Sequence, residues 1–96
     1  MKRYRAMTEQ DRESLLEFPC DFPIKVMGKN HIDLETAVVT IINEHVDDFS
    51  EGALKSRQSK NGNYLSITVT ITARSQNQLD TIYRALTSHE LVMMAL

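Results

Sequence analysis

Residues 62–73 have the sequence GNYLSITVTITA, and this stretch decides the fold because apolar and hydroxyl side chains alternate strictly along it. Alternation with a period of two is typical of a β-strand with one buried face. The aliphatic side chains predict a face that packs on helices, and the hydroxyl side chains predict a face that stays accessible to water. The predicted core positions are Leu65, Ile67, Val69, Ile71 and Ala73, and the predicted accessible positions are Ser66, Thr68, Thr70 and Thr72.

The segment before this strand suits a hairpin partner. Residues 53–60 are polar and carry Lys55, Arg57 and Lys60, and they are followed by Asn61-Gly62, a pair that tight hairpin turns favour. Cations are typical of an edge strand, where they deter the addition of further strands. We therefore expect residues 53–60 to form an edge strand joined to the central strand by a tight turn.

Two further segments have the three- and four-residue apolar spacing of amphipathic helices. The first helix is expected to be capped by Asn30 and to end near Val46. The second begins at Ser75 and Gln78, which have the spacing of a capping box, and is expected to end around Ser88. The apolar stripes consist of Leu34, Ala37, Val38, Ile41, Ile42, His45 and Val46 in the first helix and of Leu79, Ile82, Tyr83 and Leu86 in the second.

One further strand is predicted at each end of this arrangement. Residues 22–27 alternate and end at Gly28, which predicts the first strand. Residues 91–96 are almost wholly apolar and too short to favour a helix, so they predict the last strand. Alternation along this last strand directs Val92, Met94 and Leu96 into the core and Leu91 and Met93 to the opposite face.

The order strand, helix, strand, strand, helix, strand is the ferredoxin-like βαββαβ arrangement of the α+β class. It predicts a four-stranded antiparallel sheet with the first and third strands central, two helices on one face and the other face open. Residues 1–7 predict an arm, and 8–18 predict a short helix that Leu15, Leu16 and Phe18 anchor and Pro19 ends. We therefore divide the chain into an N-terminal arm at 1–18 and one domain at 19–96.

The composition disfavours several function classes. The 96-residue chain has room for one domain, and its formal charge of −2 and pI of about 5.9 give no general attraction to nucleic acid or membrane surfaces. No apolar run approaches the roughly 20 residues of a membrane span. The basic amino terminus leads into acidic residues instead of the hydrophobic region of a signal peptide, so we expect a cytoplasmic protein.

No catalytic or metal-binding pattern is present in the sequence. Cys20 has no sequence neighbour that would activate a thiol, and a lone cysteine favours a packing role. His31, His45 and His89 are too far apart in sequence to form a metal-spacing motif. We therefore predict no enzyme activity, no cofactor and no bound metal.

The open face of the predicted sheet is the first candidate functional surface. Lys25 and Met27 from the first strand and Leu91 and Met93 from the last should gather there, because these two strands pair in the inferred order. Methionine is flexible and polarizable, which suits a surface that binds partners. The simpler alternative is that single exposed apolar side chains are ordinary on any protein surface.

Two loops are further candidates for ligand recognition. The hairpin tip is one, although its Asn-Gly pair is also what a tight turn alone requires. The other lies between the first strand and the first helix, where exposed amides and a lysine can hold an anionic group. An ordinary connecting turn is the simpler interpretation of this second loop, since no glycine-rich motif surrounds it. The residues are Lys60, Asn61, Gly62, Asn63 and Tyr64 in the tip and Gly28, Lys29 and Asn30 in the second loop.

Three motifs make the sequence resemble the YbeD-like proteins, a small bacterial family of uncharacterised function. They are LLEFP at 15–19, FPIKVMG at 22–28 and SKNGNY at 59–64, and the resemblance extends from Leu15 to Leu96. It implies a ferredoxin-like fold similar to the regulatory ACT domains of amino-acid metabolism, and it implies no established activity. Genes of the family commonly lie beside those for protein lipoylation, which implies a link to lipoate metabolism by association only.

Among the functions that this fold carries, a binding or regulatory module fits the sequence best. An RNA-binding module would need aromatic residues on the central strands, where this chain has serine and threonine. An acylphosphatase-like enzyme would need a phosphate-cradling loop with arginine after the first strand, and Gly28-Lys29-Asn30 supplies only lysine. We expect a non-catalytic domain that binds a protein partner or a second copy of itself. The alternative is an ACT-like domain that senses a small metabolite, with lipoate metabolism as the pathway that the resemblance implies.

Overall fold

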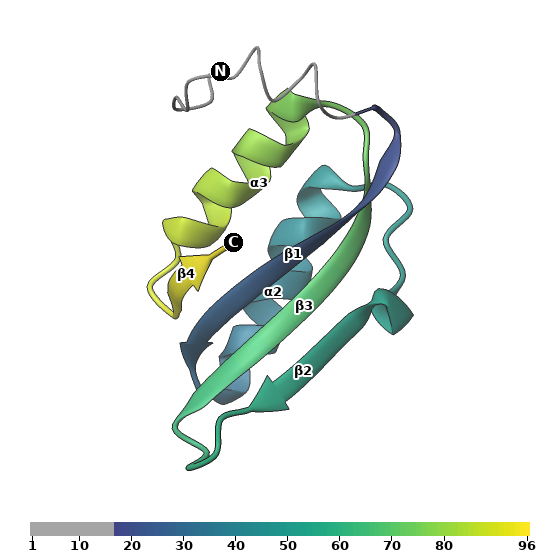
Figure 1. Ribbon diagram of the computed structural model, residues 1–96. Coiled ribbons are helices and arrows are strands. Elements are labelled where there is room, and N and C mark those ends of the chain that lie inside the picture. Colours follow the sequence, from purple (N-terminus) through teal and green to yellow (C-terminus); the bar gives the residue numbers. More distant parts are fainter. Residues whose placement is uncertain (1–16) are drawn as a thin grey trace, which may run out of the picture.

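The computed structural model describes residues 17–96, and Figure 1 shows them as one sheet with two helices on one side of it. Neighbouring strands are antiparallel and lie in the order β2-β3-β1-β4, so the first and third strands are central as predicted. This confirms the α+β ferredoxin-like arrangement. The elements are β1 (Cys20–Lys29), α2 (Ile32–His45), η1 (Glu51–Ala53), β2 (Leu54–Gln58), β3 (Tyr64–Ala73), α3 (Gln76–Thr87) and β4 (Val92–Ala95).

The predicted N-terminal helix at 8–18 falls almost wholly outside the described residues. Its last two positions, Glu17 and Phe18, are described and are not helical, and Phe18 packs against the core. The division of the chain into an arm at 1–18 and a domain at 19–96 stays a prediction.

The two faces of β3 separate as the alternation predicts. Ile67 and Val69 are fully buried, and Ile71 and Ala73 are buried with them. On the other face Thr70 is exposed, and Ser66, Thr68 and Thr72 are half-buried. The aliphatic row packs against side chains from both helices, which are Leu34, Val38, Ile41 and Ile42 of α2 and Leu79, Ile82 and Leu86 of α3.

The first strand is longer than predicted because its pairing with β3 continues past both ends of the alternating run. The register extends from Cys20 opposite Ala73 to Lys29 opposite Tyr64. Gly28 therefore lies inside β1 instead of closing it.

The cap of α2 is His31, so the expectation that Asn30 caps this helix is wrong. The Nδ1 atom of His31 accepts a hydrogen bond from the backbone N–H of Asp33 at 3.0 Å. The Asn30 side chain instead donates from Nδ2 to the carbonyl oxygen of Gly62 at 2.9 Å. Asn30 thus makes a contact distant in sequence, although local propensity favours it as the helix cap.

The predicted cap of α3 is confirmed, and it also joins the ends of the two helices. The Oγ atom of Ser75 accepts from the N–H of Gln78 at 3.0 Å. Gln78 accepts from the N–H of Arg74 through Oε1 at 2.7 Å and donates through Nε2 to the carbonyl oxygen of His45 at 2.8 Å. The last turn of α2 is therefore tied to the first turn of α3.

The hairpin between β2 and β3 has a longer loop than the tight turn that we expect. Strand β2 ends at Gln58, and Ser59 still donates its backbone N–H to the carbonyl oxygen of Tyr64 at 2.9 Å, so residues 60–63 form the loop. Gly62 alone has positive φ, at 76°, among the described residues. A two-residue Asn-Gly turn needs positive φ at both positions, and here Asn61 does not adopt it.

The last strand contains a bulge that reverses part of its predicted orientation. Met27 pairs with Met94 and Gly28 pairs with Val92, so Met93 is left between them without a partner residue. Val92 faces the core as predicted, but Met94 and Leu96 are exposed, at 45% and 70%, and the inward orientation that we expect for them is wrong. The extra residue shifts the alternation after Val92.

Leu91 precedes β4 and packs against the core, so its predicted position on the open face is also wrong. The backbone of Leu91 crosses close to Gly28 of β1. A Cβ atom built on Gly28 would overlap the Leu91 carbonyl oxygen and come within 3.0 Å of a methyl carbon of Leu34. Glycine at this position therefore permits the close approach of β4 to β1.

We predict that truncating a side chain on one face of β3 lowers the free energy of unfolding more than truncating one on the other face. Val69→Ala should lower the free energy of unfolding by about 1–3 kcal/mol because it opens a cavity in a fully buried row. Thr70→Ala removes an exposed side chain and should cost less than about 1 kcal/mol. Urea denaturation measures both, and equal losses would contradict the sheet orientation.

We also predict that Gly28→Ala destabilises the fold strongly. The added methyl group meets backbone that cannot move without displacing β4, and overpacking of this kind costs about 1–3 kcal/mol. Gly52→Ala is the matched control, since the nearest atom to its new methyl group is Ser50 Oγ at 3.6 Å. The melting temperature should fall for Gly28→Ala and change little for Gly52→Ala. Similar melting temperatures for the two variants would contradict the packing described for Gly28.

Candidate functional site

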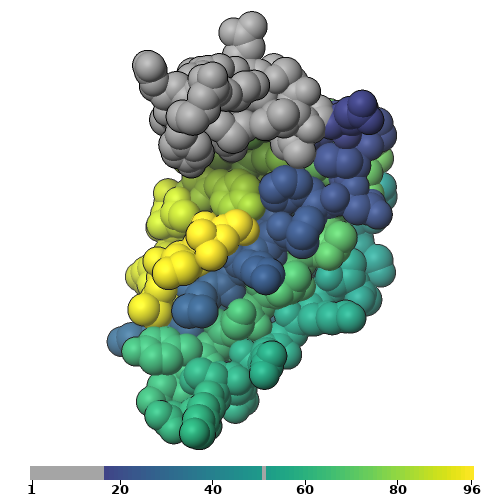
Figure 2. Space-filling model, in the orientation of Figure 1, coloured from purple at the N-terminus to yellow at the C-terminus, as the bar shows by residue number. Residues whose placement is uncertain are grey.

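The face of the sheet opposite the helices, which we call the open face, presents side chains from all four strands. Strand partners share a face, so the register identifies its members. Figure 2 shows this face, with β4 in yellow beside β1 in blue and with β3 and β2 in green and teal. Its side chains are Lys55 and Arg57 of β2, Tyr64, Ser66, Thr68, Thr70 and Thr72 of β3, Asp21, Pro23, Lys25, Met27 and Lys29 of β1, and Met94 of β4, continued by Leu96.

The open face is cationic, although the chain has a net charge of −2. Its charged side chains are Lys25, Lys29, Lys55 and Arg57 against Asp21, and all are exposed. The other carboxylates among residues 17–96 belong to helices and loops and not to the sheet. Charge is therefore segregated between the two sides of the molecule.

None of these four cations forms an ion pair or side-chain hydrogen bond with another residue of the described part of the chain. Elsewhere the molecule does pair its charges, since Arg74 donates to Asp48 at 3.2 Å. These cations lie on β1 and β2, on either side of β3, and unpaired cations on one face repel one another and attract anions, most strongly at low salt. The open face is thus suited to a partner that brings negative charge.

An apolar stripe lies beside the cations along β1 and β4. Met27 and Met94 are directly opposite each other across the two strands, and they are 40% and 45% exposed. Leu96 exchanges two backbone hydrogen bonds with Lys25, at 2.9 Å and 2.7 Å, which places it in the next row. Three large apolar side chains therefore form a continuous exposed stripe.

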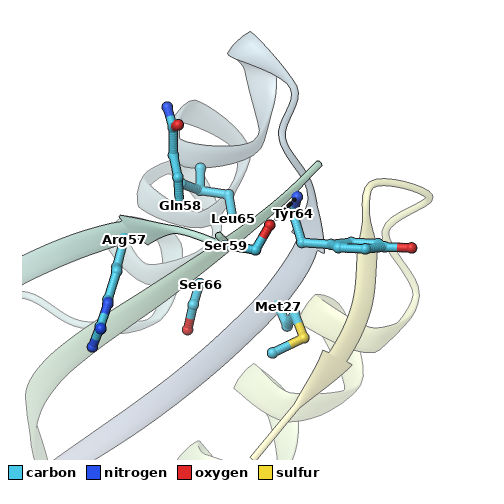
Figure 3. Close-up of a pocket in the computed structure, with 7 residues that line it drawn as sticks. All are labelled: Met27, Arg57, Gln58, Ser59, Tyr64, Leu65 and Ser66. Carbon is cyan, nitrogen blue, oxygen red and sulfur yellow. Dashed lines mark hydrogen bonds between the residues drawn. The ribbon is translucent and has the colours of Figure 1, made fainter. Parts of the chain in front are cut away.

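A hollow of about 200 Å³ lies where this face meets the hairpin. Figure 3 shows Arg57, Ser66 and Met27 on one side of the sheet and Gln58 and Leu65 on the other, with the Tyr64 ring projecting from the start of β3. The hollow is smaller than the roughly 300–1,000 Å³ of sites that enclose small ligands. It has room for one side chain of a partner.

The two candidate loops are joined to each other. The backbone N–H of Asn30 donates to the carbonyl oxygen of Asn63 at 3.0 Å, and its side chain donates to that of Gly62. Lys29 is also the strand partner of Tyr64. The Asn30 amide is therefore engaged by the hairpin tip and is not directed toward an outside anion.

The remaining candidate residues lie apart from the open face or at its border. Leu91 is half-buried, and Met93 is 57% exposed in the bulge of β4. Cys20 is half-buried against the core. The described residues contain no cluster of histidine, cysteine or carboxylate side chains that could hold a metal ion, and they contain no helix long and apolar enough to span a membrane.

Sequence reasoning missed the contribution of Met94 and Leu96 because nothing in 91–96 signals a bulge. It also assigned Lys55 and Arg57 only to edge protection. Lys55 and Arg57 are two residues apart, so they lie on one face of β2. The correct length of the hairpin loop would have given the register of β2 against β3 and so identified that face as the open one.

We predict that Asn30→Ala loosens the hairpin tip. It removes the side-chain hydrogen bond to Gly62 and should cost about 1 kcal/mol while leaving the backbone bond to Asn63 in place. Asn43→Ala, at an exposed position of α2, is the control and should be neutral or slightly stabilising. Amide hydrogen exchange at residues 60–64 should accelerate in the first variant alone, and unchanged exchange would contradict a clamping role for Asn30.

Comparison with known proteins gives relatives over nearly the whole chain. The family model described as "Protein of unknown function (DUF493)" matches residues 13–96. A UPF0250 protein of Nitrosomonas europaea is 49% identical over 90 residues, which cover 94% of this chain and 100% of that protein. A UPF0250 protein of Neisseria gonorrhoeae is 50% identical over 91 residues, with the same coverage.

A solved structure has the same fold. The solution structure of protein HP0495 from H. pylori superposes with a TM-score of 0.72 and covers 97% of this chain and 98% of its own. The two sequences are 16% identical, so this likeness bears on the fold alone.

Proposed function

We propose a function from the protein's own surface, because the chain belongs to the DUF493 family of proteins of unknown function, the YbeD-like UPF0250 proteins that its motifs resemble. The protein is a non-catalytic module that binds a protein partner through the open face. One observation carries this proposal. An exposed apolar stripe lies beside cations that have no partner within the described residues.

The apolar stripe supports protein binding more than chemistry. Met27, Met94 and Leu96 supply area that is favourable to remove from water, and the unbranched methionine side chains can adapt to the shape of a partner. The neighbouring hydroxyl groups of β3 can form hydrogen bonds within such a contact. A flat surface of this kind offers no enclosed space for a reaction.

The charge pattern supports a different protein as the partner over a second copy bound face to face. If the two-fold axis runs across the strands, two open faces in contact bring Lys55 and Arg57 of one copy against the same cations of the other. If the axis runs parallel to the strands, these cations are buried without a partner against the apolar stripe of the other copy. Like charges in contact cost several kcal/mol at an interface. Self-association through this face is therefore disfavoured.

Metabolite sensing by an ACT-like domain, linked to lipoate metabolism by resemblance alone, is the second candidate. The hollow beside Tyr64 and Met27 is the observation that favours it, since its lining is almost wholly apolar and suits a hydrocarbon chain. Its volume of about 200 Å³ would enclose only part of such a molecule. We therefore rank it below protein binding.

We predict that Met94→Glu abolishes partner capture without harming the fold. The new carboxylate interrupts the apolar stripe at an exposed position, so circular dichroism and the free energy of unfolding should stay within about 0.5 kcal/mol of wild type. Ile32→Glu is the matched control, because Ile32 is 89% exposed at the start of α2, away from the open face.

The measurement is quantitative affinity capture from native lysate with tagged wild type and both variants, paired with sedimentation across protein concentration. Proteins retained by wild type and by Ile32→Glu should be lost with Met94→Glu. Equal retention by all three would contradict the proposed surface. Concentration-dependent association that Met94→Glu removes would identify a second copy as the partner and contradict the charge argument.

A further inference from the structure

The arrangement of charge and apolar area on the open face specifies the chemistry of its partner. We propose that the occupant is an amphipathic helix of another protein, acidic along one side and apolar along the other, lying along the strands of the sheet. This proposal rests on the proposed function, since it names the class of partner that the open face binds.

The registers place the side chains in two rows that cross the sheet from β2 to β4. One row contains Arg57, Ser66, Met27 and Met94, and the next contains Lys55, Thr68, Lys25 and Leu96. In both rows the cation of β2 stands at one edge and an apolar side chain stands at the other. The cationic edge and the apolar edge therefore run parallel to each other and to the strands.

The width of the sheet fits one helix. Strands are about 4.8 Å apart, so the β2 and β4 edges are separated by about 14 Å. A helix with its side chains is about 10–12 Å across. A helix above β3 and β1 would place one side over Lys55 and Arg57 and the other over Met94 and Leu96, with Lys25 beneath it.

An added strand is a poorer occupant than a helix. Strand β4 extends over Val92–Ala95 and is bulged, and β2 extends over Leu54–Gln58 and carries cations. Short, bulged and charged edges deter strand addition. The two edge strands are thus protected, while the face between them is not covered by any described residue.

Single-stranded RNA is disfavoured for a separate reason. Tyr64 is the one aromatic side chain that the described residues place on the open face, and it lies at the start of β3. Base recognition on a sheet uses aromatic side chains on the central strands, where this face has Ser66 and Thr68. The apolar stripe would also remain unused by a phosphate backbone.

The test uses isotope-labelled full-length protein and a synthetic, terminally blocked helical peptide with leucine on one side and glutamate on the other. The comparison peptides replace every glutamate by glutamine, or keep the composition in a scrambled order. The acidic peptide should shift the amide resonances of open-face residues such as Lys25, Ser66 and Thr68. It should bind at least about tenfold more tightly than the glutamine peptide, and binding should weaken as salt is raised.

Charge-reversal variants locate the contact. Lys25→Glu combined with Lys55→Glu should weaken binding of the acidic peptide by at least about tenfold and should gain binding to a lysine-for-glutamate peptide. Arg84→Glu, at an exposed position of α3, is the control and should leave both affinities unchanged.

Each remaining outcome overturns the proposal. Equal binding of the acidic, glutamine and scrambled peptides would remove the charge requirement, and shifts confined to the helices would remove the open face. A uridine oligonucleotide that binds this face more tightly than the acidic peptide would identify nucleic acid as the occupant. If the acidic peptide fails while Met94→Glu still loses its captured partner, the acidic-helix proposal falls and the proposed function stands.

Discussion

The antiparallel pairing of β1 with β3 is the interaction on which the rest of the structure depends. Its register is unbroken from Cys20 opposite Ala73 to Lys29 opposite Tyr64, so two ten-residue strands assign their side chains to the same two faces together. A slip of one residue would move the aliphatic row into water and the hydroxyl row into the core. Burial of the aliphatic side chains thus also fixes where Lys25 and Met27 stand on the opposite face.

Much of this fold can be predicted from the sequence because its determinants are local. The alternation in β3 is visible within residues 62–73, and Ser75 caps α3 with a partner three residues away. The longer hairpin loop at 60–63 is a local failure, whereas two other failures are contacts distant in sequence. Asn30 donates its side-chain N–H to Gly62 instead of capping α2. The bulge of β4 forms where the Leu91 backbone lies close to Gly28.

The candidate site was only half predictable for the same reason. Lys25 and Met27 follow from alternation within one strand, but their neighbours Met94 and Leu96 depend on the bulge. A net charge of −2 also concealed the cationic face, since a sum over the chain carries no information on segregation between sheet and helices. Charge per face, calculated from register, is the quantity that bears on binding.

Site-specific photo-crosslinking in cells shows whether the open face is the surface that contacts a partner. A photoreactive amino acid at Thr70, exposed on the open face, is compared with one at Asn43, exposed on α2. We expect a discrete adduct with another protein from Thr70 and none from Asn43. Adducts from Asn43 with none from Thr70 would contradict it.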